Sequence, residues 1–354
     1  MTNEFQAVPD FPGDLTVSDD GSAVVETPQV HTEETSERPM ALPAYRVFIT
    51  SGCTSQMTAA RTAYDNFRDD GWINRLRSFD LCRSTAWFVR HKVTGKIRVA
   101  SSRCGLRWCP LCIRTKRFII TTSVAAWLKE REKPKFLTLT LKHSTAPLSN
   151  QIDALYGFFK EFKRRPWFKK RLKGGVWFFQ VKVSATDGLW HPHLHILFEG
   201  RFLPHADCSK KWCEITHGSS VVDIRAVNNP RKAAEYVARY AAAPCDLASL
   251  DADRAVDVIR ALHHRRIVGV FGTAAGLKLA STPPPDAADW EYLGSFGLIM
   301  HNAEIGSSDS EIVECWRSGA SCSLLPEKPP PDEVKEAVMS AEPESFRQAY
   351  LPFF

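Results

Sequence analysis

Three histidines alternate with other residues in a short stretch at 190–199. If this stretch is a strand, His191, His193 and His195 share one face, and leucine, isoleucine and phenylalanine side chains occupy the other. Alternate side chains on a strand lie ~7 Å apart, so two imidazoles can hold one divalent ion while the third orients or assists. The spacing therefore predicts a metal centre built on a strand.

The segment before these histidines offers a third ligand. Residues 176–183 have the pattern of a strand, and Asp187-Gly188 is a typical hairpin turn, so we expect the two strands to pair. Gln180 would then lie beside the imidazoles, either as a ligand or as a polar residue of the strand edge. Imidazoles with an amide oxygen suit Mg²⁺ or Mn²⁺ bound jointly with a phosphate.

A second candidate site is the pair Tyr236 and Tyr240, which are one helical turn apart. Pro230 and Pro244 bracket the helix that carries them. A tyrosine hydroxyl can attack phosphorus and keep the phosphoryl group covalently. Its ordinary pKa is about 10, so a nearby cation would assist its ionisation. The alternative is that both rings simply pack into the core.

Four cysteines precede these elements. Cys109 and Cys112 have the C-x-x-C spacing of a zinc knuckle, and Cys82 and Cys104 are able to complete a tetrahedral site. Four thiolates favour a structural Zn²⁺ ion over a catalytic metal. Unliganded buried thiols are the alternative.

Charge is distributed unevenly along the 354 residues. Residues 81–200 contain 24 Lys or Arg and six acids, whereas 1–40 contain nine acids and one base, and 301–354 contain ten acids and four bases. A basic middle with interleaved aromatic residues suits a phosphate backbone and unstacked bases; a solvated basic surface is the alternative. The residues predicted to contact DNA flank the cysteines or lie on the tyrosine helix: Arg107, Arg114, Lys116, Arg117, Lys232 and Arg239.

The sequence also indicates where the protein acts. It has no N-terminal basic segment followed by an apolar run and no apolar run of 18 residues, so we expect a cytoplasmic protein without a membrane partner. No phosphate-binding loop of the G-x-x-x-x-G-K-[ST] kind occurs, so unwinding of DNA is expected to need a separate helicase.

The predicted elements from residue 135 onward follow the order β-α-β-β-α-β-α, which is typical of an α+β fold with an antiparallel sheet. Composition divides the chain into four parts. We expect a disordered acidic arm at 1–45, a helical and cysteine-rich zinc-binding segment at 46–131, the sheet domain at 132–275 and an irregular acidic tail at 276–354.

Three motifs resemble those of the rolling-circle replication initiators of small plasmids and phages, within the HUH endonuclease superfamily. Residues 136–140 (FLTLT) are similar to the first motif, 191–197 (HPHLHIL) to the metal motif and 236–240 (YVARY) to the nucleophile motif. The knuckle at 107–112 (RWCPLC) resembles one that precedes the nuclease core of plasmid initiators. The resemblance covers roughly residues 81–275.

This resemblance implies that the sheet domain is an HUH nuclease with a five-stranded antiparallel sheet flanked by helices. It implies His193 and His195 as metal ligands and Tyr240 as the primary nucleophile, with Tyr236 as a second nucleophile or a water activator. Relatives often carry a lysine three residues after the second tyrosine. Ala243 occupies that position here, and Arg239 is the candidate source of the missing charge.

The predicted function is site-specific, metal-dependent nicking and joining of DNA through a covalent 5′-phosphotyrosine, which initiates rolling-circle replication. The protein would bind double- and single-stranded origin DNA and leave a 3′-hydroxyl for a host polymerase, while a host helicase unwinds the duplex. The alternatives are a transposase of the same superfamily with two tyrosines, and a non-catalytic zinc-dependent DNA-binding regulator.

Overall fold

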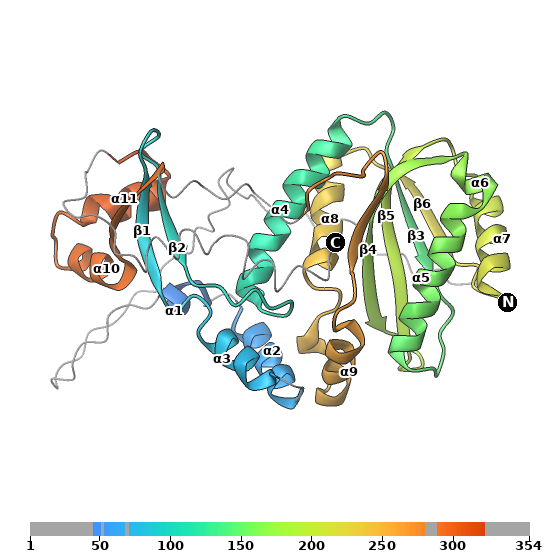
Figure 1. Ribbon diagram of the computed structural model, residues 1–354, viewed down its shortest axis with the longest axis horizontal. Coiled ribbons are helices and arrows are strands. Elements are labelled where there is room, and N and C mark those ends of the chain that lie inside the picture. The colour runs from blue at the N-terminus through green and yellow to red at the C-terminus, as the bar shows by residue number, and fades with distance from the viewer. Residues whose placement is uncertain (1–44, 51–52, 68–70, 280–288, 323–354) are drawn as a thin grey trace.

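The computed structural model describes residues 45–50, 53–67, 71–279 and 289–322 (Figure 1). The predicted acidic arm, apart from Tyr45, lies outside these residues, as does the end of the predicted tail at 323–354. No helix among the described residues is both long enough and apolar enough to cross a membrane.

The larger sheet has five strands in the order β6-β3-β5-β4-β7, and every neighbouring pair is antiparallel. The α+β class with an antiparallel sheet is therefore confirmed. Four strands match the four in the predicted order, whereas β7 follows the last predicted helix and was not among the elements predicted from the residue pattern. The strands are β3 (Lys135–Thr140), β4 (Leu172–Val183), β5 (Trp190–Gly200), β6 (Val222–Ala226) and β7 (Val268–Gly272).

Helices cover both faces of this sheet (Figure 1). Because side chains alternate along β5, Leu194 and Ile196 enter the core on one face, and Leu197 enters the core on the other. The first core contains α5 (Leu148–Arg164), α6 (Pro166–Lys169), α7 (His205–Thr216), η1 (Leu247–Ser249) and α9 (Ala252–Leu262). The second contains α4 (Pro110–Lys129) and α8 (Pro230–Ala242).

Helix α8 packs closely against β4 and α4 because its inner face consists of small side chains. Its first turn is specified locally: the Asn229 side chain accepts a hydrogen bond from the Lys232 N–H, and Pro230 occupies the first position. Because the helix lies this close to the sheet, side chains that border its inner face also lie near the sheet. The buried residues of that face are Ala233, Ala234, Val237, Ala238 and Ala241.

A second, three-stranded sheet lies apart from the first, in the order β2-β1-β8 (Figure 1). Its strands are β1 (Ala86–His91), β2 (Ile97–Ser101) and β8 (Trp290–Ser295), and α10 (Phe296–Glu304) and α11 (Ser310–Ser318) cover one face. Three short helices precede it: α1 (Tyr45–Thr50), α2 (Thr54–Asn66) and α3 (Trp72–Asp80).

This second sheet corrects two expectations. The segment at 46–131 contains two strands besides its helices, and the tail expected to be irregular contains a strand and two helices over residues 290–318. The physical reason is long-range pairing, because β8 becomes a strand by pairing with β1, about 200 residues earlier, with Trp87 opposite Ser295 and Arg90 opposite Glu291. The amino-acid composition of a segment does not indicate which distant strand it will pair with.

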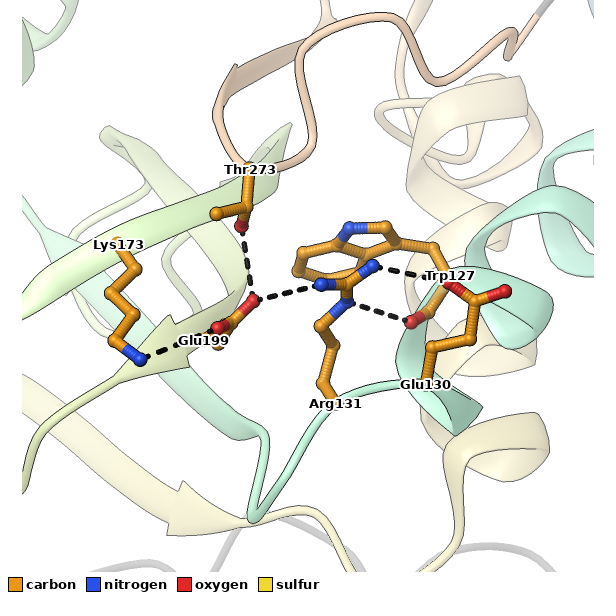
Figure 2. A network of polar contacts seen from close by, with 6 residues as sticks. All are labelled: Trp127, Glu130, Arg131, Lys173, Glu199 and Thr273. Atoms are coloured by element: carbon orange, nitrogen blue, oxygen red, sulfur yellow. Dashed lines mark hydrogen bonds and ion pairs between the residues drawn. The ribbon is translucent and has the colours of Figure 1, made fainter.

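Helix α4 is anchored at its C-terminal end by the polar network of Figure 2. The Glu199 carboxylate of β5 accepts hydrogen bonds from Thr273 Oγ1 at 3.1 Å and from Arg131 Nη1 at 3.4 Å, and it pairs with Lys173 Nζ at 3.8 Å. The Arg131 guanidinium also lies over the Trp127 ring, 5.5 Å from its centroid. These contacts tie the end of α4 to the sheet that α8 also contacts.

Candidate active site and cysteine cluster

Two imidazoles and one amide meet on the α8 side of the larger sheet. His193 and His195 of β5 are 7% and 4% exposed, and Gln180 of β4 lies opposite His193 in the register. Gln180 Oε1 lies 2.8 Å from His195 Nε2 and also contacts His193 Nε2. Three potential ligand atoms therefore converge on one small volume.

The outer nitrogens of the two rings are held by neighbours. His193 Nδ1 lies 3.1 Å from the His191 carbonyl oxygen, so it carries the proton and donates to that oxygen. His195 Nδ1 lies 3.2 Å from Thr138 Oγ1, across the β3–β5 register. With its proton on Nδ1, the His193 ring presents the lone pair of Nε2 toward Gln180, which is the tautomer that ligates a metal through Nε2.

Burial keeps these rings neutral. Desolvation lowers the pKa of His193 to about 3, and the charge of His191 adds to this effect. Desolvation likewise lowers the pKa of His195 well below its usual value, with a further contribution from His193. Both rings are therefore uncharged near neutral pH, as a metal ligand must be.

The third histidine has different contacts. The His191 ring packs edge-on against His143, with 4.4 Å between the ring centroids, and His143 Nδ1 pairs with Asp187 at 2.9 Å. Among the described contacts, those of His191 with the site are its carbonyl bond to His193 and a ring contact 5.5 Å from the His193 centroid. This arrangement matches the predicted orienting role better than the ligand role.

The two tyrosines lie on the same side of the sheet as the imidazoles. The Tyr240 ring stacks on His195, with 4.8 Å between the centroids and 25° between the planes. Tyr236 meets Tyr240 edge-on at 5.2 Å and contacts Phe136 of β3 at 5.7 Å. Both rings are half-buried, so each combines core packing with partial access to solvent.

Opposing effects act on the pKa of the Tyr240 hydroxyl. Burial raises the pKa of Tyr240 above its usual range, and Tyr236 raises it further, whereas the charge of Arg239 and a hydrogen bond with Gln180 lower it. The Arg239 guanidinium lies over the Tyr236 ring, 5.1 Å from its centroid. Arg239 therefore supplies positive charge near the tyrosines, although an additional cation is needed to make Tyr240 ionise readily.

The four cysteines converge at the other end of α4. Their Sγ atoms all lie within 4.8 Å of one another, and Cys82–Cys112, Cys104–Cys112 and Cys82–Cys109 are separated by 3.6, 3.7 and 3.7 Å. Tetrahedral ligands at 2.3 Å from a zinc ion are about 3.8 Å apart. The cluster therefore has the dimensions of a four-sulfur metal site, and it joins the ends of α3 and β2 to the start of α4.

Comparison with known proteins agrees with this geometry. The family model described as "Replication protein" (Rep_1) matches residues 96–294, more than half of the chain. The chain belongs to this replication protein family. The resemblance to plasmid replication initiators is thereby confirmed at the level of the family.

A curated relative of this replication protein is "Protein rep" from Lactiplantibacillus plantarum, 28% identical over 188 residues, which are 46% of this chain. The aligned region covers 59% of that relative, so the chain spans about three fifths of its length. No solved structure matches the chain. The family match includes the histidine strand, the tyrosine helix and three of the four cysteines, whereas Cys82 precedes it.

The basic residues that were predicted to contact DNA differ in their exposure to solvent. Arg114, Arg117 and Lys232 are exposed, and Arg239 is half-buried beside the tyrosines. Two predictions need correction. Lys116 of α4 is buried, and Arg107, which precedes α4, donates to the backbone carbonyls of Leu262 and Arg265, so neither side chain lies on an exposed basic surface.

Sequence reasoning missed several residues around the site. Thr138 and Phe136 contact the imidazole and tyrosine rings from β3, and the His143–Asp187 pair borders His191. The alternation in residues 135–140 indicates that Thr138 lies on the opposite face from Leu137 and Leu139, but its partner depends on the register between β3 and β5.

Proposed function

We propose that this replication protein nicks and joins one strand of its origin DNA through a covalent 5′-phosphotyrosine and so initiates rolling-circle replication. One observation carries the proposal: Tyr240 stacks directly on His195, whose Nε2 atom shares a small volume with His193 Nε2 and Gln180 Oε1. A nucleophile and a cation-binding set are thus within the span of one phosphate group.

His193, His195 and Gln180 are the residues that would hold Mg²⁺ or Mn²⁺. Two ligands at right angles and about 2.1 Å from a small divalent ion are about 3.0 Å apart, close to the 2.8 Å between His195 Nε2 and Gln180 Oε1. His193 Nε2 and Gln180 Oε1 face each other with lone pairs, an arrangement that a cation stabilises. When bound, the ion would polarise the scissile phosphate and neutralise charge on its oxygens.

Tyr240 is the proposed nucleophile. Its Oη atom forms a bond to phosphorus as the bond to the 3′-oxygen breaks; the phenol loses its proton and the 3′-oxygen gains one. The 5′-phosphate stays on the tyrosine, and the free 3′-hydroxyl serves a host polymerase. The positive charge of Arg239 favours the phenolate, and Tyr236 is placed to serve as a second nucleophile or to activate water in the joining step.

The remaining assignments complete the proposal. Cys82, Cys104, Cys109 and Cys112 would hold a structural Zn²⁺ ion that fixes the start of α4. The partners would be origin DNA in double- and single-stranded form, a host helicase and a host polymerase. The segment at 132–275 would be the HUH nuclease domain.

The test is incubation of the protein with a single-stranded origin oligonucleotide and Mn²⁺, followed by denaturing electrophoresis. We expect a covalent protein–DNA adduct that is abolished in Tyr236→Phe/Tyr240→Phe. The single Tyr240→Phe variant should lose the first cut, and Tyr236→Phe should retain it. An undiminished adduct in the double variant would refute tyrosine chemistry.

Two other results would redirect the assignment. Sequence-specific binding without nicking, unaffected by His193→Ala, would indicate the non-catalytic regulator. Cleavage of terminal repeats in preference to an origin would indicate the transposase.

A further inference from the structure

The small sheet has one face without a helix among the described residues. The opposite face lies beneath α10 and α11, where Phe88 and Ile97 are buried. In Figure 1 these helices lie on one side of β1 and β2, and α4 lies on the other. The register and the alternation of side chains place the following residues on the uncovered face: Trp87, Val89, His91, Arg98, Ala100, Trp290 and Tyr292.

This uncovered face combines aromatic rings with positive charge. The exposed Arg98 guanidinium lies over the Trp290 ring, 5.2 Å from its centroid, and His91 meets the same ring edge-on at 5.1 Å. Trp290 and Tyr292 are half-buried and pack beside buried Trp87 and Val89 on the same face. The two rings are therefore fixed by their neighbours and remain partly accessible.

Acidic side chains are absent from this face in the described part of the chain. The neighbouring carboxylate of β8, Glu291, turns to the helix-covered face, where it accepts a hydrogen bond from Arg90 Nε at 2.9 Å. Lys92 and Lys96, in and beside the β1–β2 turn, are exposed. The charged side chains on this face and in the adjoining turn, Arg98, Lys92 and Lys96, are therefore cationic, which suits a polyanion.

Among polyanions, single-stranded DNA fits these residues best. A duplex offers phosphates but hides the faces of its bases, whereas a single strand offers both to an aromatic and basic surface. Helix α4, which lies on the other side of β1 and β2 from α10 and α11 in Figure 1, carries exposed Arg114, Arg117 and Phe118, and Arg114 Nη1 donates to the Ile49 carbonyl oxygen at 3.3 Å. The same combination of guanidinium groups and an exposed ring recurs there, on the helix that packs against the tyrosine helix.

We propose that the uncovered face of the small sheet is a binding surface for single-stranded DNA, on which bases stack against Trp290 and Tyr292 while Arg98 contacts phosphate. That this strand is the one cut at Tyr240 rests on the proposed function; the binding itself does not. The surface would hold the strand at a distance from the reacting phosphate and would leave the chemistry of the site unchanged.

The experiment measures binding in the full chain carrying Tyr236→Phe/Tyr240→Phe, so that cleavage does not interfere. Fluorescence anisotropy with a labelled oligo(dT) of about 16 nucleotides gives Kd, and a duplex of equal length gives the comparison. We expect Arg98→Ala and Trp290→Ala each to weaken oligo(dT) binding about fivefold or more, with a smaller effect on the duplex. Arg98→Ala should also reduce the slope of log Kd against log salt by about 1.

Matched controls separate a contact from a folding defect. Leu298→Ala lies on α10, on the covered side, and should bind oligo(dT) normally; Leu298 is 49% exposed. Tyr292→Phe and Trp290→Phe keep a stacking ring and should retain most of the binding. A 5-iodouracil oligonucleotide should crosslink to Trp290 or Tyr292.

The result that overturns the proposal is unchanged oligo(dT) binding in both alanine variants, or an equal loss of duplex binding, or crosslinks confined to other surfaces. Failure of the proposed nickase activity has a different signature. In that case the protein with native tyrosines forms no adduct, yet Arg98→Ala still weakens binding. Conversely, Arg98→Ala with native tyrosines should form the adduct normally at saturating oligonucleotide.

Discussion

The cysteine cluster and the imidazole site are two candidate metal centres with opposite designs. In the first, four sulfurs surround one point at mutual distances within 4.8 Å, so every tetrahedral position is taken by the protein. In the second, His193, His195 and Gln180 approach from the sheet, and the side toward Tyr240 has no further ligand among the described residues. A closed set suits structure, and an open set leaves room for a substrate oxygen.

The two candidate metal centres also differ in their position in the fold. The cysteines come from the ends of α3, β2 and α4, so a bound ion would link elements that otherwise share few contacts. The imidazoles lie in the middle of a five-stranded sheet that has its own cores on both faces. Loss of a ligand should therefore unfold the first region and only inactivate the second.

The largest effect should follow Cys109→Ser. This change removes one of four sulfurs from a site that holds α4, and we expect it to lower the free energy of unfolding by at least about 4 kcal/mol and to release the metal. Thermal unfolding and metal content by mass spectrometry provide the measurement. Cys53→Ser, at a buried cysteine outside the cluster, is the control and should keep the metal. Full stability in Cys109→Ser would contradict a structural role.

The next effect should follow His195→Gln. We expect cleavage of the origin strand to fall at least about a hundredfold, because the cation that polarises the phosphate is lost, while the melting temperature changes little. Adduct formation over time with Mn²⁺, measured beside thermal unfolding, checks both parts. His205→Gln on α7 is the matched control. A large loss of stability in His195→Gln would contradict the prediction, because it would show that the imidazole site also has a structural role.

Lowering the pH should destabilise the protein through the buried imidazoles of the second centre. The pKa of His193 is lowered to about 3 in the folded protein, so the unfolded chain binds more protons between pH 6.5 and 3. Stability contributed by the neutral ring is present above about pH 6.5 and is lost as the pH falls, by about 1.4 kcal/mol per pH unit for each buried imidazole. Urea unfolding from pH 7 to 5 measures the slope, which should flatten in His193→Gln. Identical slopes in the two proteins would show that the ring is charged when folded.

The smallest effect should come from Thr138→Val. This substitution removes the hydroxyl that holds His195 Nδ1 and leaves the three ligand atoms in place. We expect Mn²⁺ affinity to fall about tenfold, the lower end of the range for partners of metal-bound histidines. Titration of cleavage with Mn²⁺ gives the affinity, and Thr145→Val, at an exposed threonine on the loop before α5, should not change it. An unchanged Mn²⁺ dependence in Thr138→Val would mean that the ring needs no such partner.

The predictions from sequence succeeded where the pattern is local. Alternation in residues 190–199 placed His193 and His195 on one face and Leu194 on the other, and the turn at Asp187-Gly188 brought Gln180 beside them. The prolines around residues 230–243 delimited α8. These features depend on neighbours within a few residues, so the local sequence contains the necessary information.

The predictions failed where distant segments meet. Pairing with β1 makes residues 290–295 a strand, and β7 becomes a strand by pairing with β4. Arg107 and Lys116 are basic residues typical of a DNA-binding surface, yet the fold buries Lys116 on α4 and brings Arg107 to the backbone carbonyls of Leu262 and Arg265. Charge indicates what a side chain can bind and not which way it faces.

By itself, the sequence determined the chemistry available to this protein: alternating imidazoles, two phenols one turn apart, and four thiols in a short segment, because residue type and short-range period suffice for these. Only the tertiary structure decided that Tyr240 stacks on His195, that the thiols close around one point and that one aromatic face of the small sheet has no helix on it among the described residues. Those outcomes depend on strand register and helix packing between residues far apart in the chain, and no local pattern encodes the partner of a long-range contact.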